Sequence, residues 1–197
     1  MTRLFELPAY QRLPVDPVSA SGDRLSLSNG EELLDLYGGH CVNTLGAGHA
    51  GLLSELSAQW RQLSFATNLL PLRARARFLA ALEPLLPEGR WAAFLSNSGA
   101  EANENALKAA LSATGRGAIL CFEGAFHGRT AAATWTSDVK YRGFPRPPFE
   151  VRRVPFGDLR ALEAALDTEV AGAILEPIQS LAGVVDPPAG FLERLRE

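Results

Sequence analysis

Residues 91–122 read WAAFLSNSGAEANENALKAALSATGRGAILCF, and their pattern indicates the fold class. The runs WAAFLS (91–96) and GAILCF (117–122) are short and apolar, which predicts two buried strands. Between them, residues 96–101 predict a turn and residues 102–113 predict a helix. A strand, a turn, a helix and a second strand form a βα unit, the kind of unit that builds a parallel sheet.

The same alternation continues to the last residue of the sequence. Apolar runs predict strands over residues 151–156 and 170–177, and helical spacing predicts helices over residues 158–166 and 189–197. The fold class is therefore α/β, with a mainly parallel sheet flanked by helices. In such sheets the ligand binds beyond the carboxyl ends of the strands, so the loops that follow the strands are expected to carry the chemistry.

The first third of the chain has a different character. Residues 1–30 are rich in proline, serine and polar residues, and they predict an extended arm with short turns that ends at the Asn29-Gly30 turn. Apolar residues at helical spacing predict helices over residues 50–63 and 72–86.

Composition excludes several classes of protein. The 197 residues carry a formal net charge of −3, which gives no general attraction to nucleic acid or to anionic lipid. No apolar run is long enough for a membrane span or a secretory signal, and no metal site is predicted. The two cysteines, Cys41 and Cys121, are typical of reduced thiols in a cytoplasmic protein. The only lysines are Lys108 and Lys140.

One glycine pattern suggests a nucleotide site. Gly46, Gly48 and Gly51 match G-x-G-x-x-G ahead of a predicted helix. The dinucleotide fingerprint also needs a buried strand before it and an acidic residue about 20 positions later. The preceding CVNTL is a poor strand and no acidic residue lies near Pro71, so the match is weak evidence.

The turn before the predicted helix at 102–113 has two compatible interpretations. Ser98 can cap the helix while Glu101 reaches back to it, as in a capping box. The N–H groups of Gly99 and Ala100, aided by the helix dipole, can also receive an anion such as a phosphate.

The loop EGAFHGRT (123–130) and the end of the predicted strand at 170–177 offer further candidates. Phe126 can stack on a flat ligand and Arg129 can bind a carboxylate with two hydrogen bonds, or Phe126 is a core residue and Arg129 a solvated one. His127 can act as a general base, although it has no evident partner. Glu176 ends a buried strand, where a carboxylate needs a ligand, a cap or an ion pair.

Three motifs in this order and spacing resemble one family. SNSGAEANE (96–104), GAFHGRT (124–130) and ILEPIQ (174–179) are similar to motifs of the class III aminotransferases, which are pyridoxal-phosphate enzymes of fold type I. The resemblance runs from about Leu36 to the last residue and is strongest to the acetylornithine and ornithine aminotransferase group.

The resemblance implies a set of site residues. The cofactor phosphate would bind at Ser98, Gly99 and Ala100, and Phe126 would lie against the pyridine ring. Arg129 would bind the α-carboxylate of the substrate. The remaining residues expected at the cofactor are His127 and Glu176.

The resemblance also implies a domain division and an activity. Residues 1–45 would form an N-terminal arm with elements of a small domain, and residues 46–197 part of a large cofactor-binding domain. The complete enzyme would be a cytoplasmic homodimer of arginine biosynthesis. It would transfer an amino group from an amino acid of the acetylornithine or ornithine type to a 2-oxo acid such as 2-oxoglutarate.

The sequence departs from the family pattern in three respects. Leu181 stands where many members have a switch glutamate, which leaves the amino donor open, and Gly46–Ala50 replaces a segment with more histidines. Neither the D-E-x-Q motif nor the lysine segment of the family occurs, so the chain is expected to be the N-terminal part of an aminotransferase, without a catalytic residue of its own. An inactive binding or regulatory module and a nucleotide-binding α/β protein are the alternatives.

Overall fold

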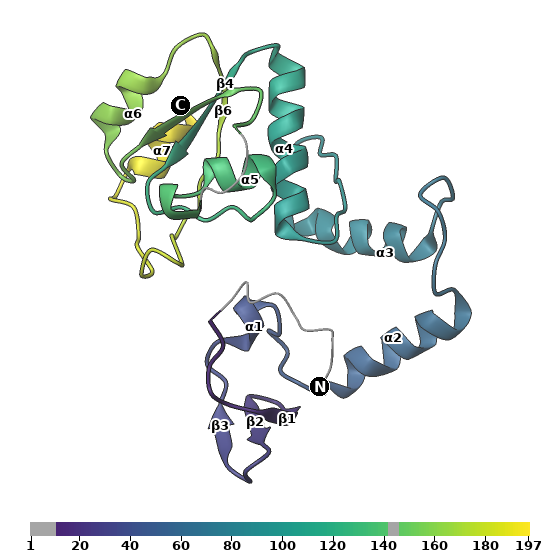
Figure 1. Ribbon diagram of the computed structural model, residues 1–197. Helices are drawn as coiled ribbons and strands as arrows, with labels where there is room; N and C mark the ends of the chain where they lie inside the picture. The colour runs from purple at the N-terminus through teal and green to yellow at the C-terminus, as the bar shows by residue number, and fades with distance from the viewer. Residues whose placement is uncertain (1–10, 142–145) are drawn as a thin grey trace, which may run out of the picture. The chain divides into compact units, whose positions relative to one another are not determined.

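The computed structural model describes residues 11–141 and 146–197. Contacts between Cα atoms divide the chain into two compact units, Met1–Pro87 and Glu88–Glu197, and each is described by itself (Figure 1). The boundary predicted between residues 45 and 46 stays a prediction, and residues 1–10 of the predicted arm lie outside the described ranges.

The first unit begins with a three-stranded antiparallel sheet in the order β1-β2-β3. Its strands are β1 Pro17–Ser21, β2 Arg24–Leu27 and β3 Glu32–Leu34. The prediction of an extended arm up to residue 30 is therefore wrong for these residues, because strands of three to five residues are too short to show a clear period of two. The turn at Asn29-Gly30 is confirmed: it joins β2 to β3, with Gly30 at a φ of +87°.

Helices follow the sheet in this unit. They are the short α1 Gly38–Cys41, then α2 Ala50–Gln62 and α3 Arg73–Leu82, followed by the 3-10 turn η1 Glu83–Leu85. The helices predicted over residues 50–63 and 72–86 are confirmed. His49 caps α2, since its Nδ1 accepts a hydrogen bond from the N–H of Leu52 at 3.2 Å.

The glycines that suggested a nucleotide loop have a local structural reason. Gly46 has a φ of +77°, and a Cβ there would lie 3.0 Å from the Cα of Gly22. Gly22 and Ala47 form an antiparallel bridge, so two backbones meet closely at this point. Within residues 11–141, the chain entering this turn is not a strand. The fingerprint's structural context is therefore missing.

The second unit is built on a parallel sheet with β4 between its two partners, in the order β5-β4-β6. The strands are β4 Ala118–Phe122, β5 Glu150–Val154 and β6 Val170–Ala173. The helices are α4 Gly99–Thr114, α5 Ala131–Thr136, α6 Leu159–Ala165 and α7 Phe191–Arg196, with a 3-10 turn η2 at Val139–Tyr141. This parallel sheet with flanking helices confirms the predicted α/β class.

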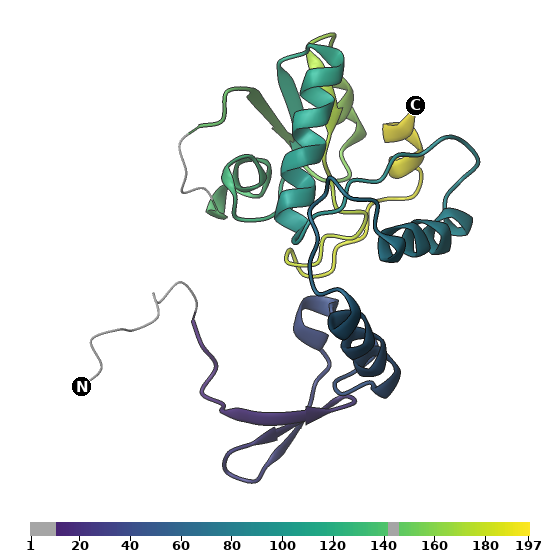
Figure 2. The same ribbon diagram turned by 90° about the vertical axis from the view of Figure 1, so that its right-hand side faces the viewer.

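Both faces of β4 are covered. Phe122 packs in one buried cluster with Leu162 of α6 and Phe191 of α7. On the other face, Ile119 packs with Leu107 of α4 and Ala132 of α5. Both views show α4 running beside the sheet, with α5 next to it (Figure 1, Figure 2). Every residue of β4 is buried, so this strand is the centre of the unit.

Two predictions for this unit fail. Residues 91–96 form no strand: Trp91 and Phe94 are 60% and 70% exposed, and no described strand pairs with the segment. An apolar run becomes a strand only when a neighbour supplies its hydrogen bonds, which the local pattern does not reveal. Conversely, α5 forms from residues that the pattern assigns to no helix. The strands and helices predicted between residues 102 and 122 and after residue 150 are confirmed, with β6 ending at Ala173.

Candidate functional site

The site begins at the N-terminus of α4. Ser98 is the N-cap, and its Oγ accepts a hydrogen bond from the N–H of Glu101 at 3.2 Å. The carboxylate of Glu101 reaches back to the N–H of Asn97 at 2.9 Å, one residue before the cap, so the predicted box is present in a shifted form. Within residues 11–141 and 146–197, the N–H groups of Gly99 and Ala100 have no hydrogen-bond partner. Two backbone donors therefore remain at the positive end of a 16-residue helix.

The loop of residues 123–130 leaves the carboxyl end of β4 and passes directly against this helix end. Gly128 has a φ of +131°, and a Cβ at this position would lie 2.7 Å from the Cβ of Ala100. Only a glycine allows this approach. Two motifs that are well separated in sequence thus meet at Ala100 and Gly128.

Phe126 is held both by its backbone and by its ring. Its N–H donates to Oε2 of Glu176 at 2.7 Å. Its half-buried ring meets the ring of Tyr141 edge to face, with centroids 5.1 Å apart and planes at 71°. Nothing in the sequence pattern pairs these two rings, because Tyr141 lies outside the three motifs.

The loop after β6 is joined to the loop after β4 by two side chains. Glu176 also accepts the N–H of Ser180 at 3.4 Å, so its carboxylate links two loop backbones. Gln179 is 2% exposed and donates from Nε2 to the carbonyl of Glu123 at 2.8 Å. Glu176 therefore acts on the site through Phe126, with its carboxylate oxygens engaged by backbone donors.

His127 points into the interior of the unit. The residue is 5% exposed, and burial lowers the pKa of its imidazole to about 4. The ring is neutral at pH 7, and its Nε2 has no partner among the described residues. Arg129, two residues later, is exposed at the end of the loop. The loop thus presents a cation outward and a neutral imidazole inward.

Further polar residues hold the loop in place. Asp138 accepts the N–H of Gly124 at 2.8 Å and that of Lys140 at 3.1 Å, and these backbone hydrogen bonds lower the pKa of its carboxyl. From α4, Asn103 donates to the carbonyl of His127 at 2.7 Å. The sequence offers one signal for Asn103: it is a polar residue on the helix stripe that also carries the buried Leu107.

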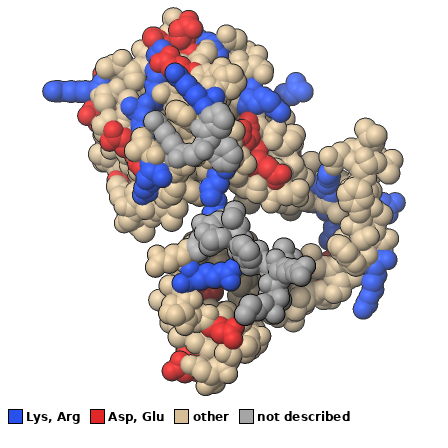
Figure 3. All heavy atoms as spheres, in the orientation of Figure 1, with Lys and Arg blue, Asp and Glu red and all other residues tan. Residues whose placement is uncertain are grey.

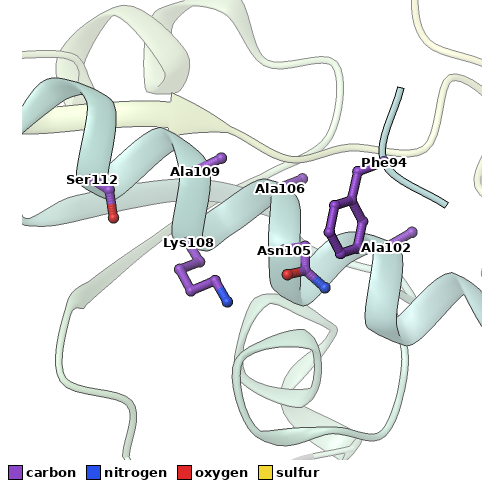
Figure 4. A pocket seen from close by; sticks show the side chains of 7 residues that line it. All are labelled: Phe94, Ala102, Asn105, Ala106, Lys108, Ala109 and Ser112. Atoms are coloured by element: carbon purple, nitrogen blue, oxygen red, sulfur yellow. The ribbon is translucent and has the colours of Figure 1, made fainter. Parts of the chain in front are cut away.

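The two lysines lie in different surroundings. Lys108 lines a groove of about 580 Å³ along α4 (Figure 4). The groove is formed by Phe94, Ala102, Asn105, Ala106, Lys108, Ala109 and Ser112. Lys140 has its Nζ 5.1 Å from the ring centroid of Tyr141. Lys108 thus lies more than two helical turns along α4 from the N-terminal amides of Gly99 and Ala100.

The profile of the family described as Aminotransferase class-III matches residues 7–197. The chain belongs to the class III aminotransferases. The acetylornithine aminotransferase of Methanopyrus kandleri is 37% identical over 196 residues, which are 98% of this chain and 50% of the relative. That of Mycolicibacterium smegmatis is 41% identical over 192 residues, 95% of this chain and 48% of the relative. The chain spans about half the length of the curated relatives it matches.

Two solved structures have the same fold over the shared part of the chain. The ornithine aminotransferase from Toxoplasma gondii, with partial occupancy of pyridoxal phosphate at its active site, superposes with a TM-score of 0.86 at 28% identity. The match covers 98% of this chain and 48% of that chain. A glutamate-1-semialdehyde aminomutase from Pseudomonas aeruginosa gives a TM-score of 0.75 at 27% identity, over 93% of this chain and 42% of that chain. The predicted fold, that of the fold type I pyridoxal-phosphate enzymes, is confirmed.

Leu181, which the resemblance sets at the position of a switch glutamate, is 46% exposed in the turn between Gln179 and Val185. Among the described residues, no helix is long and apolar enough to cross a membrane. Nor do residues 11–141 and 146–197 contain a group of three or more His, Cys, Asp or Glu residues able to hold a metal ion.

Proposed function

We propose that this chain supplies the cofactor-phosphate and carboxylate subsites of a pyridoxal-phosphate-dependent aminotransferase. The enzyme would transfer an amino group from an amino acid of the acetylornithine or ornithine type to a 2-oxo acid such as 2-oxoglutarate, as a step of arginine biosynthesis. The observation that carries the proposal is the contact between Ala100 and Gly128. It brings two amides, which have no hydrogen-bond partner among the described residues, beside the loop that holds Phe126 and Arg129. The similarity to acetylornithine aminotransferases supports the choice of substrate class.

The residues present fit a phosphate ester. The amides of Gly99 and Ala100 are donors at a helix N-terminus, where the dipole favours an anion. Gly99 has open space around it, since a Cβ there would meet no atom within 4 Å. The hydroxyl of Ser98 is engaged with Glu101, to which it donates at 3.1 Å. We therefore assign the phosphate contacts to the two amides, with Ser98 acting as the cap that orients them.

The other residues bind and orient. Phe126 would lie against the flat pyridine ring, with Tyr141 supporting its edge and Glu176 fixing its backbone. Arg129 would bind the substrate carboxylate through its planar guanidinium. The neutral, buried side chain of His127 points to the inner side of the loop and supports the loop there. When bound, pyridoxal phosphate supplies an electron-withdrawing ring that stabilises negative charge at the amino acid Cα.

We assign no catalytic residue to this chain. Lys108 lines the groove along α4, more than two helical turns from Gly99, and Lys140 lies over the ring of Tyr141. The complete enzyme is proposed to be a cytoplasmic homodimer. Cys41 and Cys121 form no disulfide bond in the described part of the chain, which supports a reducing compartment. On the Glu88–Glu197 unit, basic and acidic side chains are interspersed on the visible face (Figure 3), which supports small-molecule substrates over nucleic acid.

The test uses the 197-residue chain and two ligands. Pyridoxamine phosphate carries the phosphate and ring alone, whereas phosphopyridoxyl-ornithine, a stable secondary amine, adds the α-carboxylate. Each is titrated against the quenching of tryptophan fluorescence. Arg129→Lys should lower the affinity for phosphopyridoxyl-ornithine about ten- to a hundredfold, because a charge-assisted contact of about 1.5–3 kcal/mol loses its planar geometry. Pyridoxamine phosphate should bind as before. Equal binding of both ligands to the parent chain would refute the carboxylate subsite.

The same chain also tests the alternative that the protein is a catalytically inactive binding module. The positions of the two lysines favour that alternative for the chain tested alone. The chain is expected to bind pyridoxamine phosphate and to show no turnover of acetylornithine with 2-oxoglutarate. Measured turnover would contradict the assignment of no catalytic residue.

A further inference from the structure

One face of α4 is occupied by the loop and by α5. Ala100 contacts Gly128, Asn103 donates to the carbonyl of His127 at 2.7 Å, and Leu107 packs in a buried cluster with Ala132. Residues spaced by three and four positions lie on the same side of a helix. This side of α4 therefore follows the chain from His127 to Ala132.

Glu104 lies on the same face, one helical turn after Ala100. Its Oε1 accepts the N–H of Ala132 at 2.7 Å and that of Ala133 at 3.1 Å. These are amides of the first turn of α5, a helix of six residues whose own N-cap, Thr130, makes no side-chain cap hydrogen bond. A carboxylate from another helix thus caps α5 in place of a local side chain.

Arg129 lies between two points at which side chains of α4, Asn103 and Glu104, hold the loop by hydrogen bonds. On the N-terminal side of Arg129, Asn103 donates to the carbonyl of His127. On its C-terminal side, Glu104 accepts the N–H of Ala132. Asn103 and Glu104 belong to the same rigid helix whose first amides, at Gly99 and Ala100, form the proposed phosphate subsite. A change in either hydrogen bond would alter the separation between the two subsites without touching the phosphate donors.

We propose that Asn103 and Glu104 are positioning residues that set the distance from the phosphate subsite to the guanidinium of Arg129, and so select ligands in which phosphate and carboxylate have the matching separation. The inference rests on the proposed function, because it needs a phosphate at Gly99 and Ala100 and a carboxylate at Arg129. It gives Glu104 a part in ligand selection although its own oxygen binds only backbone amides.

The experiment again uses the 197-residue chain with pyridoxamine phosphate and phosphopyridoxyl-ornithine. Glu104→Ala and Asn103→Ala should each lower the affinity for phosphopyridoxyl-ornithine about tenfold. Each change would misplace the contact between Arg129 and the ligand carboxylate, which has the strength expected for a charged hydrogen bond. Affinity for pyridoxamine phosphate should change less than about twofold. Glu104→Gln should bind phosphopyridoxyl-ornithine with the affinity of the parent chain, because its amide oxygen can still accept the two N–H groups.

Asn105→Ala is the matched control. Asn105 is the same residue type on the same helix, but it donates only to the carbonyl of Glu101 within α4 and lines the groove along α4. It should leave both affinities unchanged. Should Glu104→Ala fail to fold by circular dichroism, Asn103→Ala carries the test, since it removes a single hydrogen bond.

Two results overturn the inference while leaving the proposed function standing. One is an equal loss of affinity for both ligands in a folded Asn103→Ala variant, which would indicate a general structural role. The other is unchanged binding of phosphopyridoxyl-ornithine in both alanine variants. If the parent chain itself fails to prefer phosphopyridoxyl-ornithine, the carboxylate subsite is refuted and the inference falls with it.

Discussion

Replacing Gly128 by alanine is expected to destabilise the Glu88–Glu197 unit by at least about 2 kcal/mol, as the sum of two effects. The first is backbone strain: a φ of +131° belongs to a region that only glycine adopts readily, and a side chain there costs about 1–3 kcal/mol. The second is overlap, because the new Cβ would lie 2.7 Å from the Cβ and 3.1 Å from the Cα of Ala100. Overpacking of this kind costs about 1–3 kcal/mol.

Two other glycines of the unit separate these effects. Gly115 has a φ of +67° and open space around it, so Gly115→Ala introduces strain alone and should cost about 1 kcal/mol. Gly172 has neither problem, since a Cβ there would lie 3.7 Å from the Cβ of Ala110. Gly172→Ala should leave the free energy of unfolding unchanged or raise it by up to about 1 kcal/mol.

Urea unfolding followed by tryptophan fluorescence measures all three variants. Trp60 and Trp91 are 72% and 60% exposed in the folded chain, so the largest change on unfolding should come from the half-buried Trp135 of α5. Gly128→Ala should have the lowest midpoint of the three, with Gly115→Ala between it and Gly172→Ala. A midpoint for Gly128→Ala equal to that for Gly115→Ala would show that the loop does not pack against α4 in solution.

Three further outcomes are expected. The pKa of His127 is about 4 in the folded chain against the usual 6.5 of a histidine, so the unfolded chain binds the proton preferentially. The free energy of unfolding should therefore fall as the pH is lowered from 6.5 to 4, by about 3 kcal/mol in all. His127→Phe should remove this part of the dependence in urea titrations at pH 7 and pH 5, and a parallel decline in both proteins would assign it to other groups. Ala100→Pro removes one amide donor and should lower the affinities for inorganic phosphate and pyridoxamine phosphate about tenfold, as measured by equilibrium titration. Unchanged affinities would show that the phosphate binds at another place. Trp91 and Phe94 are largely exposed, so sedimentation velocity should show concentration-dependent association of the chain, and a compact monomer at all concentrations would contradict this.

The sequence predicts the sheet of the second unit well, because its strands and helices have strong local patterns. Buried parallel strands are apolar runs, and AILCF at 118–122 is such a run. The segment at 91–96 has an equally apolar pattern and fails, since pairing with a neighbour is a property of the whole sheet. The strands β1, β2 and β3 fail for the opposite reason, because they are short and largely exposed and their pairing depends on turns.

The candidate site divides in the same way. The order of the three motifs leads to Gly99, Phe126, Arg129 and Glu176, because strand ends and a helix start can be located by pattern. The contacts that hold those residues are long-range: Glu104 caps a helix 28 positions away, and the ring of Tyr141 meets that of Phe126. A polar side chain on a buried helical stripe is the only local trace of such a contact.

The middle position of β4 has a consequence for how the protein is made. Both of its partners are translated after it, β5 from Glu150 and β6 from Val170. During synthesis the nascent chain therefore carries an apolar strand with two unpaired edges until β5 leaves the ribosome, and with one unpaired edge until β6 does, and such edges recruit other chains. We expect holding chaperones to bind the nascent protein in this interval. In the finished fold the same strand should keep its amide protons longest in deuterated water, because it opens last.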